Sequence, residues 1–157
     1  MAAHTMSDEE VWAFLGSTPP HTGKLATVRA DGGPHVAPIW FALDGREIMF
    51  STGATTVKGR ALQRDGRAAL CVDDERPPFS FVVVQGTVEL IDDRAELVRW
   101  AGIIGGRYMG ADQADAYGKR NGVPGELLVR LRPQRISAMT ERGANPSTDK
   151  ANCRTSL

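Results

Sequence analysis

Residues 25–52 decide the fold, and they read LATVRADGGPHVAPIWFALDGREIMFST. Apolar and polar residues alternate along this stretch, and two short glycine-containing segments interrupt it, Asp31-Gly32-Gly33 and Asp44-Gly45. Alternation with a period of two, broken by Asp-Gly turns, is typical of β-hairpins. The stretch therefore predicts three consecutive antiparallel strands over Leu25–Ala30, His35–Leu43 and Glu47–Thr52.

Similar patterns predict further strands over Ala68–Val72, Phe79–Ile91 and Glu126–Met139. Helical periodicity and capping residues predict four short helices, which begin near Ser7, Thr55, Arg94 and Ala111. The third of these is expected to end at about Ile104, before Gly105-Gly106. Together the elements predict a mainly β fold with peripheral helices, in which about six or seven antiparallel strands form a barrel.

The strand over Phe79–Ile91 contains Phe81-Val82-Val83-Val84, which is apolar on both of its faces. A strand of this kind must be covered twice, once by the barrel interior and once by another element or subunit. The sequence therefore predicts a homodimer with this strand at or near the interface.

The chain has 157 residues, a length that fits one domain. Residues 1–6 precede the first helix signal and are expected to be disordered or an expression remnant. Residues 7–139 are predicted to form a single barrel domain. Residues 140–157 are polar and carry few apolar side chains, so they are predicted to form a flexible tail.

Charge and composition exclude several classes of partner. With 19 basic and 19 acidic side chains, the chain has no net field of the kind that attracts nucleic acid or anionic lipid. It has neither a long apolar run nor a signal-peptide pattern, so we expect a cytoplasmic protein with no membrane association. The two cysteines, Cys71 and Cys153, have no metal-ligand spacing, and we expect neither a disulfide nor a metal site.

Side chains that commonly act as catalysts do not form a recognisable set. The three histidines show no metal-binding spacing, and the sequence has no nucleophile elbow and no phosphate-binding glycine loop of the common types. The carboxylate run Asp73-Asp74-Glu75 lies in a predicted hairpin loop and is expected to be solvated surface. We therefore predict no catalytic side chain and no metal ligand.

The segment Ser51–Arg60 has the features of an anion site. Ser51 and Thr52 end a predicted strand, a glycine-containing turn follows, and Lys58 and Arg60 lie at the start of a predicted helix. Unpaired backbone N–H groups and the helix dipole favour an anion at that position. The segment is a plausible phosphate cradle, although a solvated cationic helix face would have the same composition.

A second candidate region is His35–Trp40, on the strand before it. Pro38 removes a hydrogen-bond donor from the strand, so backbone groups there can meet a planar ligand. Trp40 could form one wall of such a pocket, although a tryptophan in a strand is also a common core or interface residue.

The order and spacing of these motifs resemble the pyridoxamine-phosphate-oxidase-like split-barrel family, and within it the branch of deazaflavin-dependent (coenzyme F420) reductases. The resemblance covers about residues 10–138. It rests on residues 25–32, on residues 34–40, on Lys58-Gly59-Arg60-Ala61-Leu62 with residues 64–68, and on Val84-Gln85-Gly86-Thr87-Val88-Glu89. It implies an FMN-binding split-barrel fold and two equal sites at a dimer interface.

The resemblance also implies positions for the coenzyme. The ring would lie along Val36, Ala37, Pro38 and Ile39 near Trp40, Ser51 and Thr52 would contact the ribityl chain and phosphate, and Lys58-Gly59-Arg60 would bind the phosphate. The stretch Arg107–Gly110 would help to cover the coenzyme or substrate. Thr56 departs from the family pattern, because many relatives have a basic residue there, and this departure could weaken phosphate binding or leave it to the partner chain.

The function implied is that of an F420-dependent oxidoreductase that transfers hydride to an unsaturated small-molecule substrate, with the coenzyme supplying the chemistry. An FMN-dependent oxidase or reductase on the same fold is one alternative, and a non-catalytic flavin- or deazaflavin-binding protein is another. The acidic tail of coenzyme F420 would favour arginine partners, for which Arg64, Arg107, Arg130 and Arg132 are candidates.

Overall fold

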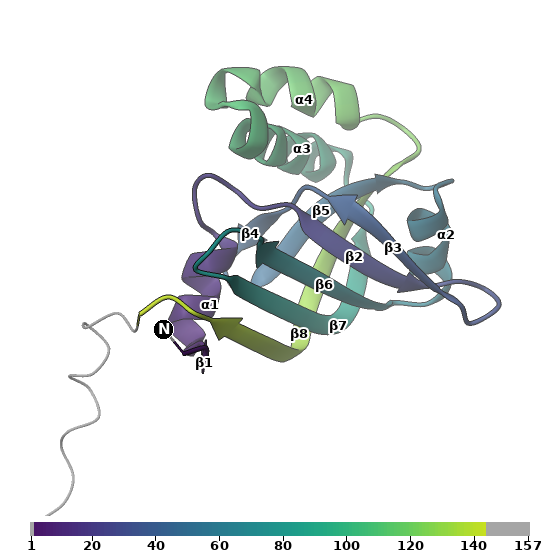
Figure 1. The fold of residues 1–157 in the computed structure, drawn as a ribbon. Coiled ribbons are helices and arrows are strands. Elements are labelled where there is room, and N and C mark those ends of the chain that lie inside the picture. The colour runs from purple at the N-terminus through teal and green to yellow at the C-terminus, as the bar shows by residue number, and fades with distance from the viewer. Residues whose placement is uncertain (1, 144–157) are drawn as a thin grey trace, which may run out of the picture.

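A computed structural model describes residues 2–143 of the chain, drawn as a ribbon in Figure 1. The strands are β1 (His4–Thr5), β2 (Gly23–Val28), β3 (Pro34–Ile39), β4 (Ala42–Asp44), β5 (Glu47–Gly53), β6 (Arg67–Asp74), β7 (Ser80–Ile91) and β8 (Glu126–Thr140). The helices are α1 (Asp8–Leu15), α2 (Val57–Arg64), α3 (Arg94–Met109) and α4 (Ala114–Asn121), with a 3₁₀ turn over Ala111–Gln113.

The strands form one antiparallel sheet in the order β3-β2-β6-β7-β8-β5-β4, and β1 is added to the end of β8. The mainly β fold with peripheral helices is confirmed, with eight strands in place of the six or seven expected. The expected strand over His35–Leu43 is wrong in one respect, because it divides into β3 and β4. Since β3 pairs with β2 and β4 pairs with β5, residues Trp40 and Phe41 carry the chain from one edge of the sheet to the other.

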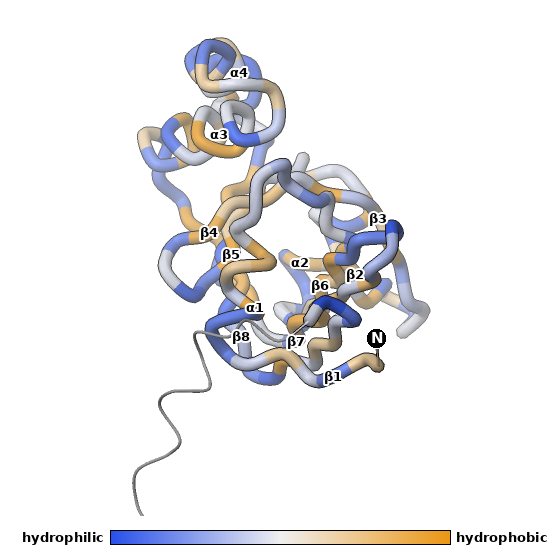
Figure 2. The backbone as a smooth tube through the Cα atoms, turned by 60° about the vertical axis from the view of Figure 1, so that its left-hand side comes forward, coloured by the Kyte–Doolittle hydropathy of each residue, from blue (hydrophilic) through white to orange (hydrophobic). Residues whose placement is uncertain are grey.

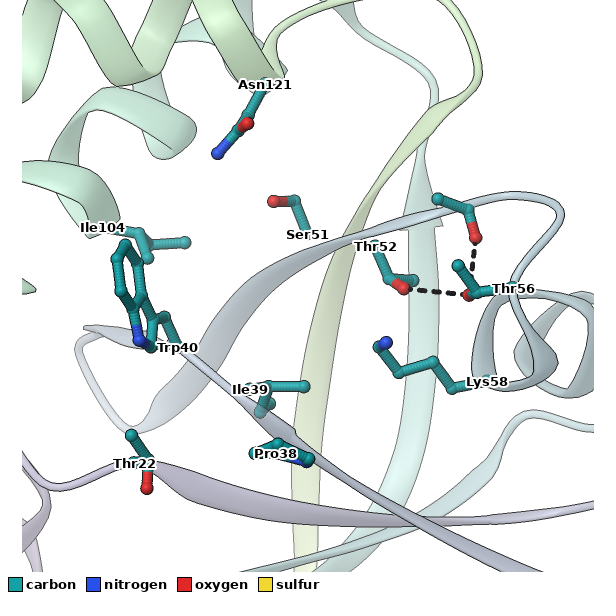
Figure 3. Close-up of a pocket in the computed structure, with 11 residues that line it drawn as sticks. Thr22, Pro38, Ile39, Trp40, Ser51, Thr52, Thr56, Lys58, Ile104 and Asn121 are labelled. Atoms are coloured by element: carbon teal, nitrogen blue, oxygen red, sulfur yellow. Dashed lines mark hydrogen bonds between the residues drawn. The ribbon is translucent and has the colours of Figure 1, made fainter.

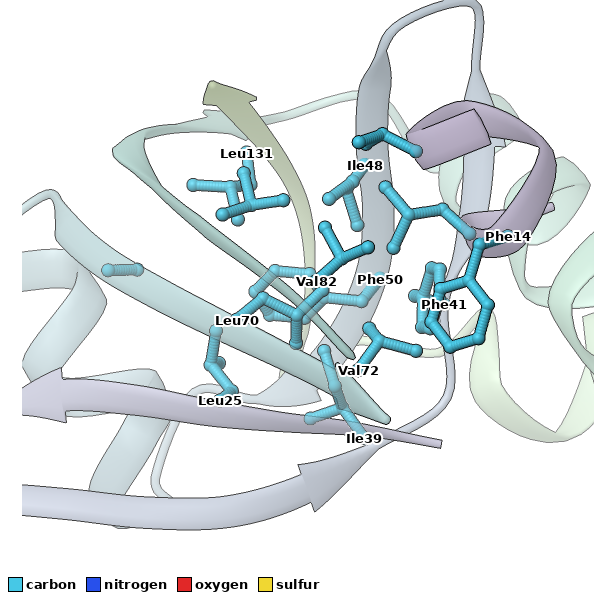
Figure 4. Close-up of a cluster of buried hydrophobic side chains, with 14 of the residues drawn as sticks. Phe14, Leu25, Ile39, Phe41, Ile48, Phe50, Leu70, Val72, Val82 and Leu131 are labelled. Carbon is cyan, nitrogen blue, oxygen red and sulfur yellow. The ribbon is translucent and has the colours of Figure 1, made fainter. Parts of the chain in front are cut away.

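The barrel interior is filled by side chains that alternate along the strands (Figure 4). Leu70 and Val72 of β6 are fully buried, while Ala69 and Cys71 between them are only partly covered. Phe41 and Phe50 are the largest of the fully buried side chains. The hydrophobic segments lie along the strands and α3, whereas α4 is mainly hydrophilic (Figure 2).

Helix α1 begins as its sequence predicts. Ser7 is the N-cap, its side chain accepts a hydrogen bond from the Glu10 backbone N–H, and Glu10 accepts one in return from the Ser7 N–H. Helix α2 likewise has Thr56 as its N-cap.

Helix α3 does not end at Gly105-Gly106 as expected but continues to Met109. The reason is packing, because a Cβ at Gly105 would lie 2.2 Å from the Tyr117 Cβ of α4. The glycine is therefore a point of close helix contact and not a terminator. Helices α3 and α4 lie side by side across one end of the barrel (Figure 1).

The exclusion of residues 1–6 from the fold is corrected by the structure. His4 and Thr5 pair with Thr140 and Met139 of β8, and the Met6 side chain is 8% exposed within the barrel core. Because the apolar Met6 side chain packs in the core, the segment that precedes α1 is part of the fold. At the other terminus, residues 144–157 of the predicted tail lie outside the described residues, while Thr140 belongs to β8. Within residues 2–143, no helix is both long and apolar enough to cross a membrane.

Candidate coenzyme-binding site

A cavity of about 380 Å³ opens between β3, β5 and the α3–α4 pair (Figure 3). One end carries hydroxyl groups and a lysine, and the other end is walled by aromatic and aliphatic side chains. The residues that line it are Thr22, Pro38, Ile39, Trp40, Ser51, Thr52, Gly53, Thr56, Lys58, Ile104 and Asn121.

The polar end is built on the start of α2. The Thr56 hydroxyl accepts a hydrogen bond from the Gly59 N–H at 3.0 Å, donates one to the Gly53 carbonyl at 2.8 Å and lies 3.2 Å from the Thr52 hydroxyl. A Cβ at Gly59 would lie 2.0 Å from the Gly53 oxygen, so only glycine allows the helix to approach β5 this closely. The cap leaves the N–H groups of the first helical residues, Val57 and Lys58, directed outward from the helix start.

Lys58 reaches the cavity from this first turn and forms no ion pair with the described residues. Glu126, the first residue of β8, lies close by, and its carboxylate would be 3.5 Å from a Cβ at Gly53. Burial raises the pKa of Glu126 above its usual value, and the positive charge of Lys58 opposes that rise. The polar end therefore holds a cation without an ion-pair partner among the described residues, with the Glu126 carboxyl group close by.

Trp40 forms the aromatic wall of the cavity, and two tyrosines pack against its ring. The Trp40 and Tyr108 rings stack with centroids 4.9 Å apart and planes 3° from parallel, and Tyr117 lies 5.7 Å from Trp40 in a tilted arrangement. The Tyr108 hydroxyl donates to the His21 carbonyl at 2.7 Å. Burial raises the pKa of Tyr108, so the phenol stays protonated and the hydrogen bond persists at neutral pH. These contacts fix the position of the indole ring.

Arg107 supports the same wall indirectly. Its guanidinium donates to the carbonyls of Leu15 and Phe41, at 2.7 Å in each case, and stacks over the Phe41 ring at 4.8 Å. It therefore joins the end of α3 to the segment that links β3 and β4. Arg107 holds the frame of the cavity and does not line it, and a covering role for Arg107–Gly110 stays a prediction.

The four arginines expected to bind an acidic coenzyme tail are all engaged within the chain. Arg64 donates to the Val28 carbonyl, Arg130 pairs with Asp44, and Arg132 pairs with Glu47 and Glu89. Arg107 is bound to carbonyls as described. Each of the four therefore already has a partner within the chain.

The structure brings together six of the ten predicted site residues, Pro38, Ile39, Trp40, Ser51, Thr52 and Lys58. Val36 is 63% exposed on the outer side of β3, and Ala37 does not line the cavity. Gly59 lies behind the helix cap, and Arg60 projects from an exposed position on α2 outside the cavity.

Sequence analysis missed five lining residues, Thr22, Gly53, Thr56, Ile104 and Asn121. Gly53 and Thr56 lie within the segment already singled out and could have been included. Nothing in the local sequence of Thr22, Ile104 or Asn121 indicates a ligand, because only the tertiary fold brings their elements to the cavity.

The acidic run Asp73-Asp74-Glu75 is not solvated throughout as expected, because Asp73 and Asp74 belong to β6 and Asp74 is 7% exposed. Asp74 is buried and accepts hydrogen bonds from Arg76 and Arg142, and Asp73 pairs with Lys24. Among residues 2–143, no group of three or more His, Cys, Asp or Glu side chains could hold a metal ion. Cys71 is free and half-buried, and burial raises its pKa, while Cys153 lies outside the described residues.

Comparison with known proteins gives a match between residues 7–140 and the model of the family described as pyridoxamine 5'-phosphate oxidase. The conserved hypothetical protein Rv2991 from Mycobacterium tuberculosis is similar in structure, with a TM-score of 0.75, 27% identity, and coverage of 87% of this chain and 86% of that chain. A protein described as an F420 reductase has a TM-score of 0.60 at 30% identity, over 75% of this chain and 90% of its own.

The fold is shared more widely. HutZ, a haem storage protein from Vibrio cholerae, has a TM-score of 0.65 at 18% identity, over 82% of this chain and 92% of its own. At that identity the likeness concerns the fold alone.

Proposed function

Because the chain belongs to the pyridoxamine 5'-phosphate oxidase family, we propose that it is an oxidoreductase that binds coenzyme F420 and transfers hydride to an unsaturated small molecule. The observation that carries this proposal is the polarity of the cavity, from the unpaired Lys58 at one end to Trp40 at the other. A coenzyme with a flat ring system joined to a phosphate by a ribityl chain has the same polarity. The F420 reductase at 30% identity supports the choice of coenzyme.

The residues present fit such a group. Lys58 and the N–H groups at the start of α2 would hold the phosphate, because charge and helix dipole both favour an anion there. Trp40 and Ile104 would wall the ring and exclude water, and Thr52 would lie beside the ribityl chain. The bound coenzyme supplies the hydride, so the protein needs no nucleophile, and its side chains bind and orient.

An FMN-dependent enzyme is the nearest alternative. FMN shares the tricyclic ring, the ribityl chain and the first phosphate, so Lys58, Thr52 and Trp40 would serve either coenzyme. The four arginines that would have favoured the acidic tail of F420 already have partners within the chain, so they do not favour F420 over FMN. The preference for F420 therefore rests on the similarity to the F420 reductase and on the family resemblance of the motifs.

Haem binding receives less support from the cavity. The axial ligands of haem iron are His, Cys, Met or Tyr side chains. None of these residue types is among the described residues that line the cavity.

The test is calorimetric titration of the purified protein with F420, FMN and haemin side by side. We expect F420 to bind most tightly and the reduced coenzyme to be turned over with a conjugated acceptor such as menadione. Tighter binding of FMN, or copurification with stoichiometric FMN, would replace F420 by FMN in the proposal. Tight F420 binding without turnover of any conjugated acceptor would favour a non-catalytic binding protein.

A further inference from the structure

We propose that Asn121 and Ser51 form a second polar subsite in the cavity, beside Trp40, which hydrogen-bonds an uncharged planar carbonyl group. The inference rests on the proposed function and adds to it a chemical class of ligand for the end of the cavity remote from Lys58.

Asn121 is the last residue of α4 and is half-buried at the cavity. Its side chain points away from the helix and toward Ser51, with Trp40 and Ile104 to one side of the space between them (Figure 3). Neither the Asn121 amide nor the Ser51 hydroxyl forms a side-chain hydrogen bond with the residues that the structure describes. Two polar groups therefore face one space with their hydrogen-bonding capacity free.

Close helix packing holds Asn121 in this place. A Cβ at Gly122 would lie 2.4 Å from Val98 Cγ2 of α3, and one at Gly118 would lie 3.0 Å from the Val98 carbonyl oxygen. The backbone on both sides of Asn121 therefore rests directly on α3. Because α3 also carries Tyr108, whose ring stacks on Trp40, the amide and the indole belong to one connected frame.

The chemistry of the subsite selects for neutral ligands. An amide and a hydroxyl can each donate to a carbonyl oxygen, and neither brings a charge. The aliphatic and aromatic walls favour a planar, conjugated group, whereas a carboxylate would find no cation among the described residues that line this end, since Lys58 lines the other. A ligand without an acceptor would leave both polar groups buried and unpaired, which disfavours its binding.

Two sources could supply the carbonyl. One is the dione edge of the coenzyme ring itself, and the other is the conjugated carbonyl of a hydride acceptor. If the coenzyme supplies the carbonyl, then coenzyme binding depends on Asn121, and if the acceptor supplies it, then acceptor binding depends on Asn121. Separate titrations of the two ligands therefore distinguish the two sources.

The experiment compares the parent protein with Asn121→Leu, which keeps a similar volume without hydrogen bonds, and with Asn121→Asp, which keeps the shape but loses the amide donor. Riboflavin, which has the ring but no phosphate, is titrated into each free protein by calorimetry. Menadione, an uncharged planar diketone, is titrated into each coenzyme-loaded protein with tryptophan fluorescence as the readout. Gln113→Leu is the matched control, because Gln113 is exposed and bonds only Asp112.

We expect both Asn121 variants to weaken the binding of at least one probe by about five- to tenfold, as loss of a hydrogen bond predicts, and Gln113→Leu to change neither. Weaker riboflavin binding identifies the coenzyme as the source, and weaker menadione binding identifies the acceptor. Unchanged binding of both probes by variants with the parent's circular dichroism spectrum would overturn the inference. Failure of the parent to bind any flavin or deazaflavin would instead refute the proposed function.

Discussion

At the scale of single residues, Lys58 faces the cavity, and no carboxylate among the described residues forms an ion pair with it. We predict that Lys58→Ala weakens coenzyme binding by about tenfold or more, since a charge-assisted hydrogen bond to phosphate contributes roughly 1.5–3 kcal/mol. Calorimetric titration of the variant measures the loss, and the fold should be retained because the side chain makes no ion pair.

Arg60 provides the comparison on the same helix, because it has the same charge but an exposed position outside the cavity. Arg60→Ala should cost distinctly less affinity than Lys58→Ala. Equal losses for the two variants would show that the phosphate lies on the outer side of α2, and unchanged affinity for both would remove the phosphate site from this helix.

Glu126 predicts a pH dependence of binding. Because burial raises its pKa, the carboxyl group gains a proton at a higher pH than an ordinary glutamate, and in the neutral form it no longer repels a phosphate beside Lys58. Anion affinity should therefore increase as the pH falls through this pKa. Glu126→Gln should bind coenzyme about threefold or more tightly than the parent at pH 8, as expected for one screened like charge.

The difference between Glu126→Gln and the parent should shrink toward pH 5, which titrations at several pH values will show. Glu75→Gln, on an exposed loop, is the control and should follow the parent at every pH. If Glu126→Gln also follows the parent throughout, the carboxyl group is not near the bound anion.

At the scale of elements, the α3–α4 pair depends on glycine at its contact. We predict that Gly105→Ala destabilises the protein by about 1–3 kcal/mol despite the better helix propensity of alanine, because the new methyl group would overlap Tyr117 near its backbone. Chemical denaturation followed by circular dichroism gives the change in the free energy of unfolding.

Gly106→Ala is the neighbouring control. Its Cβ would lie 3.2 Å from the Ala114 Cβ, a tight contact but not an overlap. Its cost should be smaller and partly offset by helix propensity. If Gly105→Ala is as stable as the parent, then the two helices are free to separate and α4 cannot hold Asn121 rigidly.

These elements also show what the sequence could predict. Alternation in β6 and β7 and the capping box at Ser7 depend on neighbours along the chain, and they were predicted within a few residues. The division of β3 from β4 and the length of α3 depend on which distant segment each packs against. A periodic pattern shows that a strand or helix forms but not its partner, so these two features were predicted incorrectly.

At the scale of the whole molecule, one end of the cavity could be predicted from the local sequence and the other end could not. The polar end comes from one continuous segment, Ser51–Lys58, so its residues could be singled out together. The other end joins Thr22, Ile104 and Asn121 from three separate elements to Trp40, and no local pattern connects them. The partners of Arg130 and Arg132 are also remote in sequence, since they are Asp44, Glu47 and Glu89. The local sequence could therefore not show that these arginines form ion pairs within the chain.

The outer face of the barrel leads to the last prediction, that the protein is a homodimer. Phe81 of β7 and Met139 of β8 are direct cross-strand neighbours, and they are 38% and 40% exposed. Val36 on β3 is 63% exposed, and Phe79 just before β7 is 48% exposed. Large apolar side chains that are exposed beside one another, as Phe81 and Met139 are, mark interaction surfaces. Because β3 carries both Val36 and the cavity residue Pro38, pairing through this face would bring the cavity rim to the interface.

Light scattering on the protein after size-exclusion chromatography should give about twice the chain mass of 17.0 kDa. Phe81→Asp should shift that mass toward one chain and also weaken coenzyme binding, since the rim of the cavity would lose its neighbour. Ile103→Asp, at a similarly exposed apolar position on α3, should change neither property. A parent mass of one chain at every concentration would refute the dimer. A dimer that persists in Phe81→Asp with full coenzyme affinity would place the interface on another face and leave the cavity complete within one chain.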